Sequence, residues 1–459
     1  MPLGALGGIA LLGAGLWTTG WTAPGALSPP SVAVGAALFK ADHPKAGPLL
    51  NAAACSACHA GGGRGDAPAA SGPLPAAVVL RLSAPARRRT GEPAPDVRYG
   101  DQLQPLSHHP HHPGLGLGEG RIDVVYRPVE GRYADGTPYT LRAPVYRVRG
   151  LAHGPLGEGV TFSVRSAPAV VGLGALQAIP ATELAARADP FDADGDGISG
   201  RINWVWDILE ARHAPGRFGH KGEMPSLVQQ IAGALWSDMG VTSPLFPWPV
   251  CTAVQGDCLA RVDFAVLDAD GGQLAALEAF HLALPPPARR GYPQDPEVRR
   301  GAELFEGLNC STCHTPRQRV GPIRPSPLAS GLQRTGRGAV PRPPGGIIWP
   351  YTDLLLHDMG GDCDPVVQEG DAWVQRCTGL ADGRVVFDAS GREWRTPPLW
   401  GLGWAKALNP EMGYLHDGRA RTLEEAILWH GGEGTAAREG FRQLTAAQRR
   451  ALLRFLASL

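Results

Sequence analysis

Two short stretches of the chain carry residues that could hold a metalloporphyrin. Cys55-Ser56-Ala57-Cys58-His59 and Cys310-Ser311-Thr312-Cys313-His314 each place two thiols three positions apart, with a histidine directly after the second. This order is the attachment signature of c-type haem: each thiol adds to one vinyl group of the porphyrin, and the imidazole becomes the proximal iron ligand. One copy alone could be a redox dithiol or half of a zinc site. Two copies predict two covalently bound haem c groups, ligated by His59 and His314.

Helical patterns surround both attachment stretches. The pattern Gly-x-x-Leu-Phe precedes each of them, over 35–39 and 301–305, and the second copy follows Asp295-Pro296, a helix start with proline in the first turn. Further helices are predicted over 181–188, 226–238, 422–429 and 445–459, the last two opening on a threonine suited to capping. Residues 75–170 instead have β-branched and aromatic residues between turn signals. The predicted fold is therefore mostly α: two cytochrome c-like haem domains, with a β-rich insertion in the N-terminal half and long loops.

The composition sets limits on partners and on domain number. The 459 residues are enough for two or three domains. Lys+Arg and Asp+Glu are equal at 43 each, so no basic surplus indicates a nucleic-acid partner. Gly (62) and Pro (44) are abundant, which favours loops and turns around cofactors. The Pro-rich joint around 284–291 predicts a boundary, with an N-terminal haem domain over 24–284, a linker over 285–295 and a C-terminal haem domain over 296–459.

The N-terminal segment and the remaining cysteines indicate an exported protein. Residues 3–17 form an apolar run that is short for a membrane span and typical of a signal peptide, although no Lys or Arg precedes Lys40. A buried N-terminal helix is the alternative. We predict a signal peptide over 1–23, a periplasmic location and no membrane span once the signal is removed. In an oxidising compartment, the close pairs Cys251/Cys258 and Cys363/Cys377 predict two local disulfides.

The C-terminal sequence resembles that of known dihaem enzymes. His416-Asp417-Gly418, followed by Thr-Leu-Glu-Glu-Ala over 422–426 and then by His430, is similar to the C-terminal domain of bacterial dihaem cytochrome c peroxidases and of MauG-like enzymes, which mature methylamine dehydrogenase. Those peroxidases have a methionine ligand where this chain has His430. The resemblance therefore implies that His314 and His430 both ligate the second iron, a pairing that lowers its potential relative to His/Met. Alternatively, His430 is a histidine facing the helix C-terminus.

Longer motifs connect nearly the whole chain to one family. Residues 194–201, 216–219, 238–243, 350–360 and 394–401 make it similar to the dihaem oxidoreductases, also described as peroxidases and sometimes labelled thiol oxidoreductases. The resemblance implies that the C-terminal haem accepts electrons from a small redox protein, either a cytochrome c or a copper protein. The N-terminal haem then receives these electrons and reduces hydrogen peroxide.

Peroxide cleavage needs an open iron position and a group that moves a proton between the two oxygens. The peroxidases line this pocket with a glutamine and then a Glu-Met pair, and Gln229-Gln230 followed by Asp238-Met239 has a similar layout. Asp238 is the predicted distal acid, with Gln229 or Gln230 beside it and Glu223 in reserve. Alternatively, Asp238 caps the end of its helix.

Two other features concern ligands of the first haem and of calcium. Pro75 stands where a loop histidine can cap the first iron in the peroxidases, so the histidines over 108–112 are candidates for a displaceable ligand; a solvent-exposed cluster or an adventitious metal site is the alternative. Residues 192–197 match the first half of an EF-hand loop, with carboxylates at positions 1, 3 and 5 and glycine at 6. Position 12 is Asn203 instead of glutamate. The predicted calcium ligands are Asp192, Asp194, Asp196 and the backbone of Ile198; an Asp/Gly turn without metal is the alternative.

The sequence thus predicts a periplasmic dihaem c-type enzyme that reduces hydrogen peroxide. One alternative is a MauG-like oxidase acting on a protein or organic substrate. Another is an electron-transfer cytochrome in which both irons are six-coordinate. Three arginines, Arg201, Arg395 and Arg419, are candidates for holding haem propionates through forked hydrogen bonds.

Overall fold

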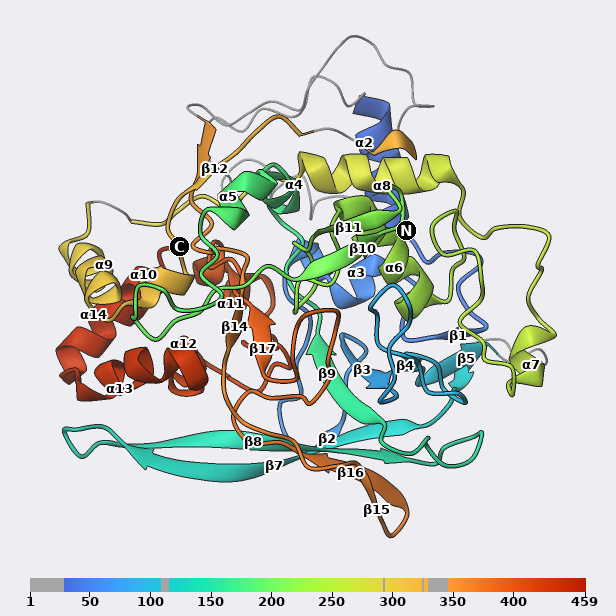
Figure 1. The fold of residues 1–459 in the computed structure, drawn as a ribbon, viewed down its shortest axis with the longest axis horizontal. Coiled ribbons are helices and arrows are strands. Elements are labelled where there is room, and N and C mark those ends of the chain that lie inside the picture. Colours follow the sequence, from blue (N-terminus) through green and yellow to red (C-terminus); the bar gives the residue numbers. More distant parts are fainter. Residues whose placement is uncertain (1–28, 109–114, 292–293, 324–325, 329–345) are drawn as a thin grey trace, which may run out of the picture.

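The computed structural model describes residues 29–108, 115–291, 294–323, 326–328 and 346–459 (Figure 1). The predicted signal peptide and His109, His111 and His112 lie outside these residues. Helices make up 28% of the structure and strands 22%, the strands being spread over many small sheets. The expectation of a mostly α protein built from cytochrome c-like domains was therefore wrong. Most strand residues lie in the N-terminal half, and the C-terminal half, where the sequence predicts long loops, adds several short strands.

In each half of the chain, a helix before the attachment stretch packs against a helix that comes after it. Helix α2 (Pro29–Lys40) packs on α8 (Gly271–Ala283), and α9 (Pro296–Gly307) packs on α14 (Ala446–Leu456). Glycine is required at each crossing: a Cβ on Gly35 would lie 1.9 Å from the carbonyl oxygen of Ala276, and one on Gly301 would lie 2.0 Å from that of Ala451. A phenylalanine pair closes each crossing, Phe39–Phe280 at 5.2 Å and Phe305–Phe455 at 5.3 Å between ring centroids.

Side-chain caps fix where several helices begin. Asp295 accepts a hydrogen bond from the Glu297 amide at 2.9 Å at the start of α9, and Thr445 and Gln448 form a capping box on α14. Thr422 caps α12 (Leu423–Leu428), so both predicted threonine caps are present. Helix α13 (Thr435–Gln443), between them, was not predicted. The remaining helices are α3 (Cys55–Cys58), η1 (Ala60–Gly62), α4 (Leu173–Gln177), α5 (Ala181–Ala185), α6 (Leu227–Met239), α7 (Gly256–Leu259), α10 (Cys310–Cys313), α11 (Leu402–Leu408) and η4 (Gly432–Gly434).

The largest sheet combines strands from both halves of the chain. Its order is β15-β16-β8-β7-β2, built on the long hairpin of β7 (Arg121–Arg132) and β8 (Pro138–Arg149), along the lower edge of Figure 1. β16 (Ala372–Arg376) joins β8 antiparallel, with Ala372 opposite Arg149, and continues into β15 (Val367–Glu369). β2 (Gly72–Pro73) forms the other edge. The predicted domain boundary near 285 stays a prediction, although this pairing crosses it.

Smaller sheets hold the segments around the attachment stretches. β3 (Val78–Ser83) pairs with β4 (Gln102–Leu103) and β9 (Thr161–Ser166) over a separate apolar cluster. β14 (Leu356–Asp358) pairs with β17 (Glu393–Arg395). The other strands are β1 (Leu49–Leu50), β5 (Leu106–His108), β6 (Leu115–Leu117), β10 (Trp204–Asp207), β11 (Arg212–Pro215), β12 (Gln318–Arg319) and β13 (Ile347–Ile348).

The cysteines divide as predicted. Cys251–Cys258 and Cys363–Cys377 form disulfides, while Cys55, Cys58, Cys310 and Cys313 are free. Two main apolar cores lie beside the free pairs, one around α2, α6 and α8, the other around α9, α12 and α14. Within the described residues, no helix combines the length and the apolar character needed to cross a bilayer.

Candidate functional site

The first attachment stretch lies on α3, and its histidine is oriented by a backbone carbonyl. His59 Nδ1 is 2.7 Å from the carbonyl oxygen of Pro168. Because a carbonyl only accepts, Nδ1 carries the proton and Nε2 remains as the metal-binding nitrogen. Burial raises the pKa of Cys55 to about 11 and that of Cys58 to about 12. A redox dithiol normally has a lowered pKa, which these two thiols lack.

The second attachment stretch, on α10, has the same arrangement. His314 Nδ1 lies 3.1 Å from the carbonyl oxygen of Tyr351, which again leaves Nε2 as the ligand atom. Burial raises the pKa of Cys310 to about 12. The repeated geometry at His59 and His314 suits a proximal imidazole in both places.

His430 follows the end of α12 and faces the second attachment stretch. Its Nδ1 is 2.8 Å from the carbonyl oxygen of Ala426, so its Nε2 is also left as the ligand atom. Burial and, second, the neighbouring His430 lower the pKa of His314 to about 4, so the two half-buried imidazoles lie near each other. The arrangement suits the predicted pair His314 and His430.

Two half-buried arginines have a charge that a haem propionate would balance. Arg64 donates to the carbonyl oxygens of Gly413 at 3.0 Å and Leu415 at 2.6 Å, and Arg395 donates to those of Gly219 and Thr396. Burial lowers the pKa of both guanidinium groups to about 10. In the part of the chain that the structure describes, neither pairs with a carboxylate. A buried, unbalanced guanidinium is costly, so an anion at each site fits the residues present.

The other two arginine candidates already have protein partners. Arg201 forms an ion pair with Glu393, and Arg419 Nε lies 2.8 Å from Asp417 Oδ2. Of the three predicted propionate ligands, only Arg395 has no carboxylate partner among the described residues. Arg64, which sequence reasoning missed, has no local motif to distinguish it from a surface arginine.

Asp238 lies beside the first attachment stretch and does not cap its helix. Its backbone oxygen accepts the amide hydrogens of Asn51 at 2.7 Å and Ala52 at 3.1 Å, just before Cys55. Its carboxylate accepts from Gln102 Nε2 at 3.1 Å and lies 4.0 Å from Arg81. Helix α6 ends at Gly240 in the left-handed conformation (φ 67°). Asp238 is therefore held in place near the predicted haem by several polar contacts.

The structure separates Gln229 from Asp238. Nine helical residues turn the chain through about 900°, so the two side chains point to opposite faces of α6. Gln229 Nε2 donates to the Trp206 carbonyl at 2.9 Å, and its Oε1 accepts from the Ile208 amide at 3.0 Å. Gln230 faces nearer to Asp238, and its Oε1 is buried with no hydrogen-bond partner among the described residues. The reserve candidate Glu223 accepts the Lys221 amide hydrogen at 2.7 Å.

His281 is a further buried histidine near the first attachment stretch. Its Nδ1 lies 2.7 Å from the Leu277 carbonyl oxygen, and burial lowers its pKa to about 4. Phe39 contacts both His281 and His59, with centroid distances of 5.5 and 6.5 Å. Because Phe280 and Phe455 occupy the same place in the two helix crossings, His281 corresponds to the core residue Leu456. In the sequence, a single histidine in an apolar helix indicates only a core position, so His281 could not be connected with the first attachment stretch.

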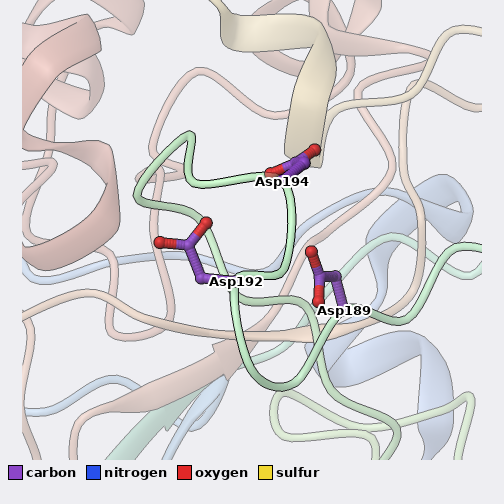
Figure 2. Close-up of side chains that lie close together, drawn as sticks. All are labelled: Asp189, Asp192 and Asp194. Atoms are coloured by element: carbon purple, nitrogen blue, oxygen red, sulfur yellow. The ribbon is translucent and has the colours of Figure 1, made fainter.

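The acidic loop brings together a different set of carboxylates from the one predicted. Figure 2 shows Asp189, Asp192 and Asp194 around one point, with an oxygen of each within 4.8 Å of the others. Asp196 instead accepts the Ile198 amide hydrogen at 2.9 Å. Asp189 lies before the EF-hand pattern, so the pattern did not include it. Calcium binding stays a prediction.

Comparison with known proteins establishes the family. Residues 31–459 match the family described as "Di-haem oxidoreductase, putative peroxidase". The chain belongs to this family, whose members are oxidoreductases with two haems. Among solved structures, hydrazine synthase of Kuenenia stuttgartiensis, studied under xenon pressure, is similar at 15% identity over 61% of this chain and 93% of its own, with a TM-score of 0.26. No curated protein matches the chain.

Proposed function

We propose that this protein is a periplasmic dihaem c-type peroxidase. In this proposal a small redox protein gives electrons one at a time, and two of them with two protons convert one hydrogen peroxide into two waters. When bound, the two haems would supply electron storage at the second site and the centre that reduces peroxide at the first. The apolar segment over 3–17 and the two disulfides support export.

The observation that carries the proposal is the difference between the two attachment sites. At the second, His430 offers an imidazole nitrogen to complete the coordination of the iron. At the first, the Asp238 backbone oxygen holds the neighbouring loop, and its carboxylate, whose charge acts on Cys55 and Cys58, is a group that can exchange protons. One site is therefore suited to electron transfer and the other to proton-coupled chemistry.

Asp238 would serve as the acid and base of the reaction. Its carboxylate would take a proton from the near oxygen of peroxide and return it to the leaving oxygen. Gln102 and Ser237, which donate to the carboxylate at 3.1 Å each, hold its orientation. The pair of Arg81 with Asp238 keeps a positive charge beside it.

The test is single-turnover mixing of half-reduced, haem-loaded protein with hydrogen peroxide, followed by absorption. We expect two electrons consumed per peroxide, and a rate roughly 10²- to 10⁴-fold lower in Asp238→Asn. Asp101→Asn is the matched control, because it removes a second carboxylate that contacts the same Arg81, at 3.4 Å. If the unaltered protein does not react, the peroxidase proposal fails and the electron-transfer alternative is favoured. Consumption of peroxide only with an organic or protein substrate would favour an oxidase.

A further inference from the structure

The backbone of the motif over 350–360 is hydrogen-bonded to the second attachment stretch. The carbonyl of Tyr351 accepts the Nδ1 hydrogen of His314. The amide of Asp353 donates to the carbonyl of Cys313 at 3.1 Å. The segment therefore fixes the orientation of the proximal imidazole and of the helical turn that carries the thiols.

His357, in the same motif, connects two carboxylates in the interior. Its Nε2 lies 2.8 Å from Asp353 Oδ2, and its Nδ1 lies 2.8 Å from Glu433 Oε2. Nδ1 is also 3.5 Å from the sulfur of Cys313. Because a carboxylate accepts hydrogen bonds, both ring nitrogens carry protons and the ring is an imidazolium. Burial alone would lower the pKa of His357, but the hydrogen bonds to the carboxylates of Asp353 and Glu433 raise it above its ordinary value.

Glu433 belongs to the turn that follows His430. Its other oxygen, Oε1, accepts from Ser199 Oγ at 2.7 Å. Gly432, with φ 51°, lies against β14 so closely that a Cβ there would be 2.2 Å from the carbonyl oxygen of Asp358. The glycines at 431 and 432 allow the backbone of this turn several conformations. Other contacts are therefore needed to hold the imidazole of His430 in one position.

We propose that Asp353, His357 and Glu433 form a clamp that keeps His430 on the second haem iron. The contacts run without a break from His314 through the motif backbone to Asp353 and His357. From there they continue to Glu433 and the turn after His430. The clamp thereby ties the distal ligand to the segment that orients the proximal one. These are positioning residues, and the inference rests on the proposed ligation by His314 and His430.

The central steps of the path are charge-assisted hydrogen bonds between largely buried side chains. The side chains of His357 and Asp353 are 4% and 3% exposed, and that of Glu433 is 11% exposed. Charged hydrogen bonds are roughly twice as strong as neutral ones, and more so in a buried environment. Replacing either Glu433 or His357 removes the charged side-chain contact between β14 and the ligand turn and leaves only their backbone packing, whereas attachment through Cys310 and Cys313 is untouched.

The test uses full-length, haem-loaded protein and the spin state of the second haem. We would record EPR spectra of the oxidised protein, and carbon monoxide binding to the reduced protein, for Glu433→Gln, His357→Gln and His430→Ala. His430→Ala defines the spectrum of the second haem without its sixth ligand. Glu425→Gln is the matched control: it removes an equally buried carboxylate one turn before His430, where Glu425 pairs with Arg421.

We expect Glu433→Gln and His357→Gln to show a mixture of the unaltered and His430→Ala spectra, with carbon monoxide binding at the second haem accelerated at least about tenfold. Glu425→Gln should match the unaltered protein. If both clamp variants stay low-spin while His430→Ala changes, the clamp is refuted and ligation by His430 stands. If His430→Ala itself changes nothing, the ligation fails and the clamp falls with it. Loss of the second haem from the clamp variants would also overturn the inference, since the clamp acts after attachment.

Discussion

Asp382 is the sole carboxylate paired with two buried cations in the described structure, and its replacement should be severely destabilising. It lies 2.9 Å from Lys221 Nζ and 3.2 Å from Arg165 Nη2, and the side chains of Lys221 and Asp382 are 0% and 4% exposed. Ser163 Oγ donates to it at 2.6 Å. Burial alone would raise the pKa of Asp382, but the two cations lower it below its ordinary value. The substitution Asp382→Asn keeps the shape and removes the charge.

The expected loss follows from leaving two cations without a carboxylate. Removing one partner of a buried pair costs about 3–5 kcal/mol, so the folding equilibrium constant should fall roughly 10²- to 10⁴-fold. Burial lowers the pKa of Lys221 to about 8, and removing Asp382 would lower it further. Lys221 can then lose its proton, so the deficit should be smaller at about pH 9 than at about pH 6.

Guanidinium unfolding of the haem-loaded protein, followed by intrinsic fluorescence and by circular dichroism, measures this loss. Asp362→Asn is the control, because Asp362 has an 86% exposed side chain and only a 3.8 Å contact to Arg392. It should change the free energy of unfolding by less than about 0.5 kcal/mol. A loss below about 1 kcal/mol in Asp382→Asn, or a deficit that grows with pH, would refute the reasoning.

Two further predictions concern a buried acid and a helix crossing. Burial raises the pKa of Glu119 above its ordinary 4.5 to about 8, so its contribution to stability is present below pH 4.5 and is lost as pH rises through 8. Glu119→Gln should remove that part of the pH dependence in unfolding titrations, and an unchanged profile would contradict the assignment. Gly301→Ala should cost about 1–3 kcal/mol or more by forcing α9 off α14, whereas Gly307→Ala, with nothing within 4 Å of the new Cβ, should not destabilise. Equal midpoints for the two variants would show that the crossing tolerates a side chain.

The residues that the sequence predicted best are those whose chemistry is local. Haem attachment requires thiols and imidazole within five consecutive positions, so His59 and His314 could be chosen without a structure. The disulfide Cys363–Cys377 was predictable because its partners are close in the chain. The caps at Thr422 and Thr445 depend only on the first turn of their helices.

The structural features that could not be predicted from the sequence depend on contacts between segments far apart in the chain. The pairing of Ala372 with Arg149 adds C-terminal strands to an N-terminal hairpin, and no local pattern indicates that pairing. Gln229 was paired with Asp238 by similarity of spacing, but helical rotation sends it to the opposite face. The His357–Glu433 contact joins a strand to a turn far along the chain, and no pattern in either segment indicates it.

The central claim is that one haem is open for peroxide while the other is closed by two histidines. EPR spectra of the haem-loaded protein, fully oxidised and half-reduced, before and after peroxide, test it most directly. We predict a high-spin signal that disappears with peroxide, beside a low-spin bis-histidine signal that persists or reappears. Two low-spin signals, indifferent to peroxide in both states, would contradict the claim and leave an electron-transfer protein.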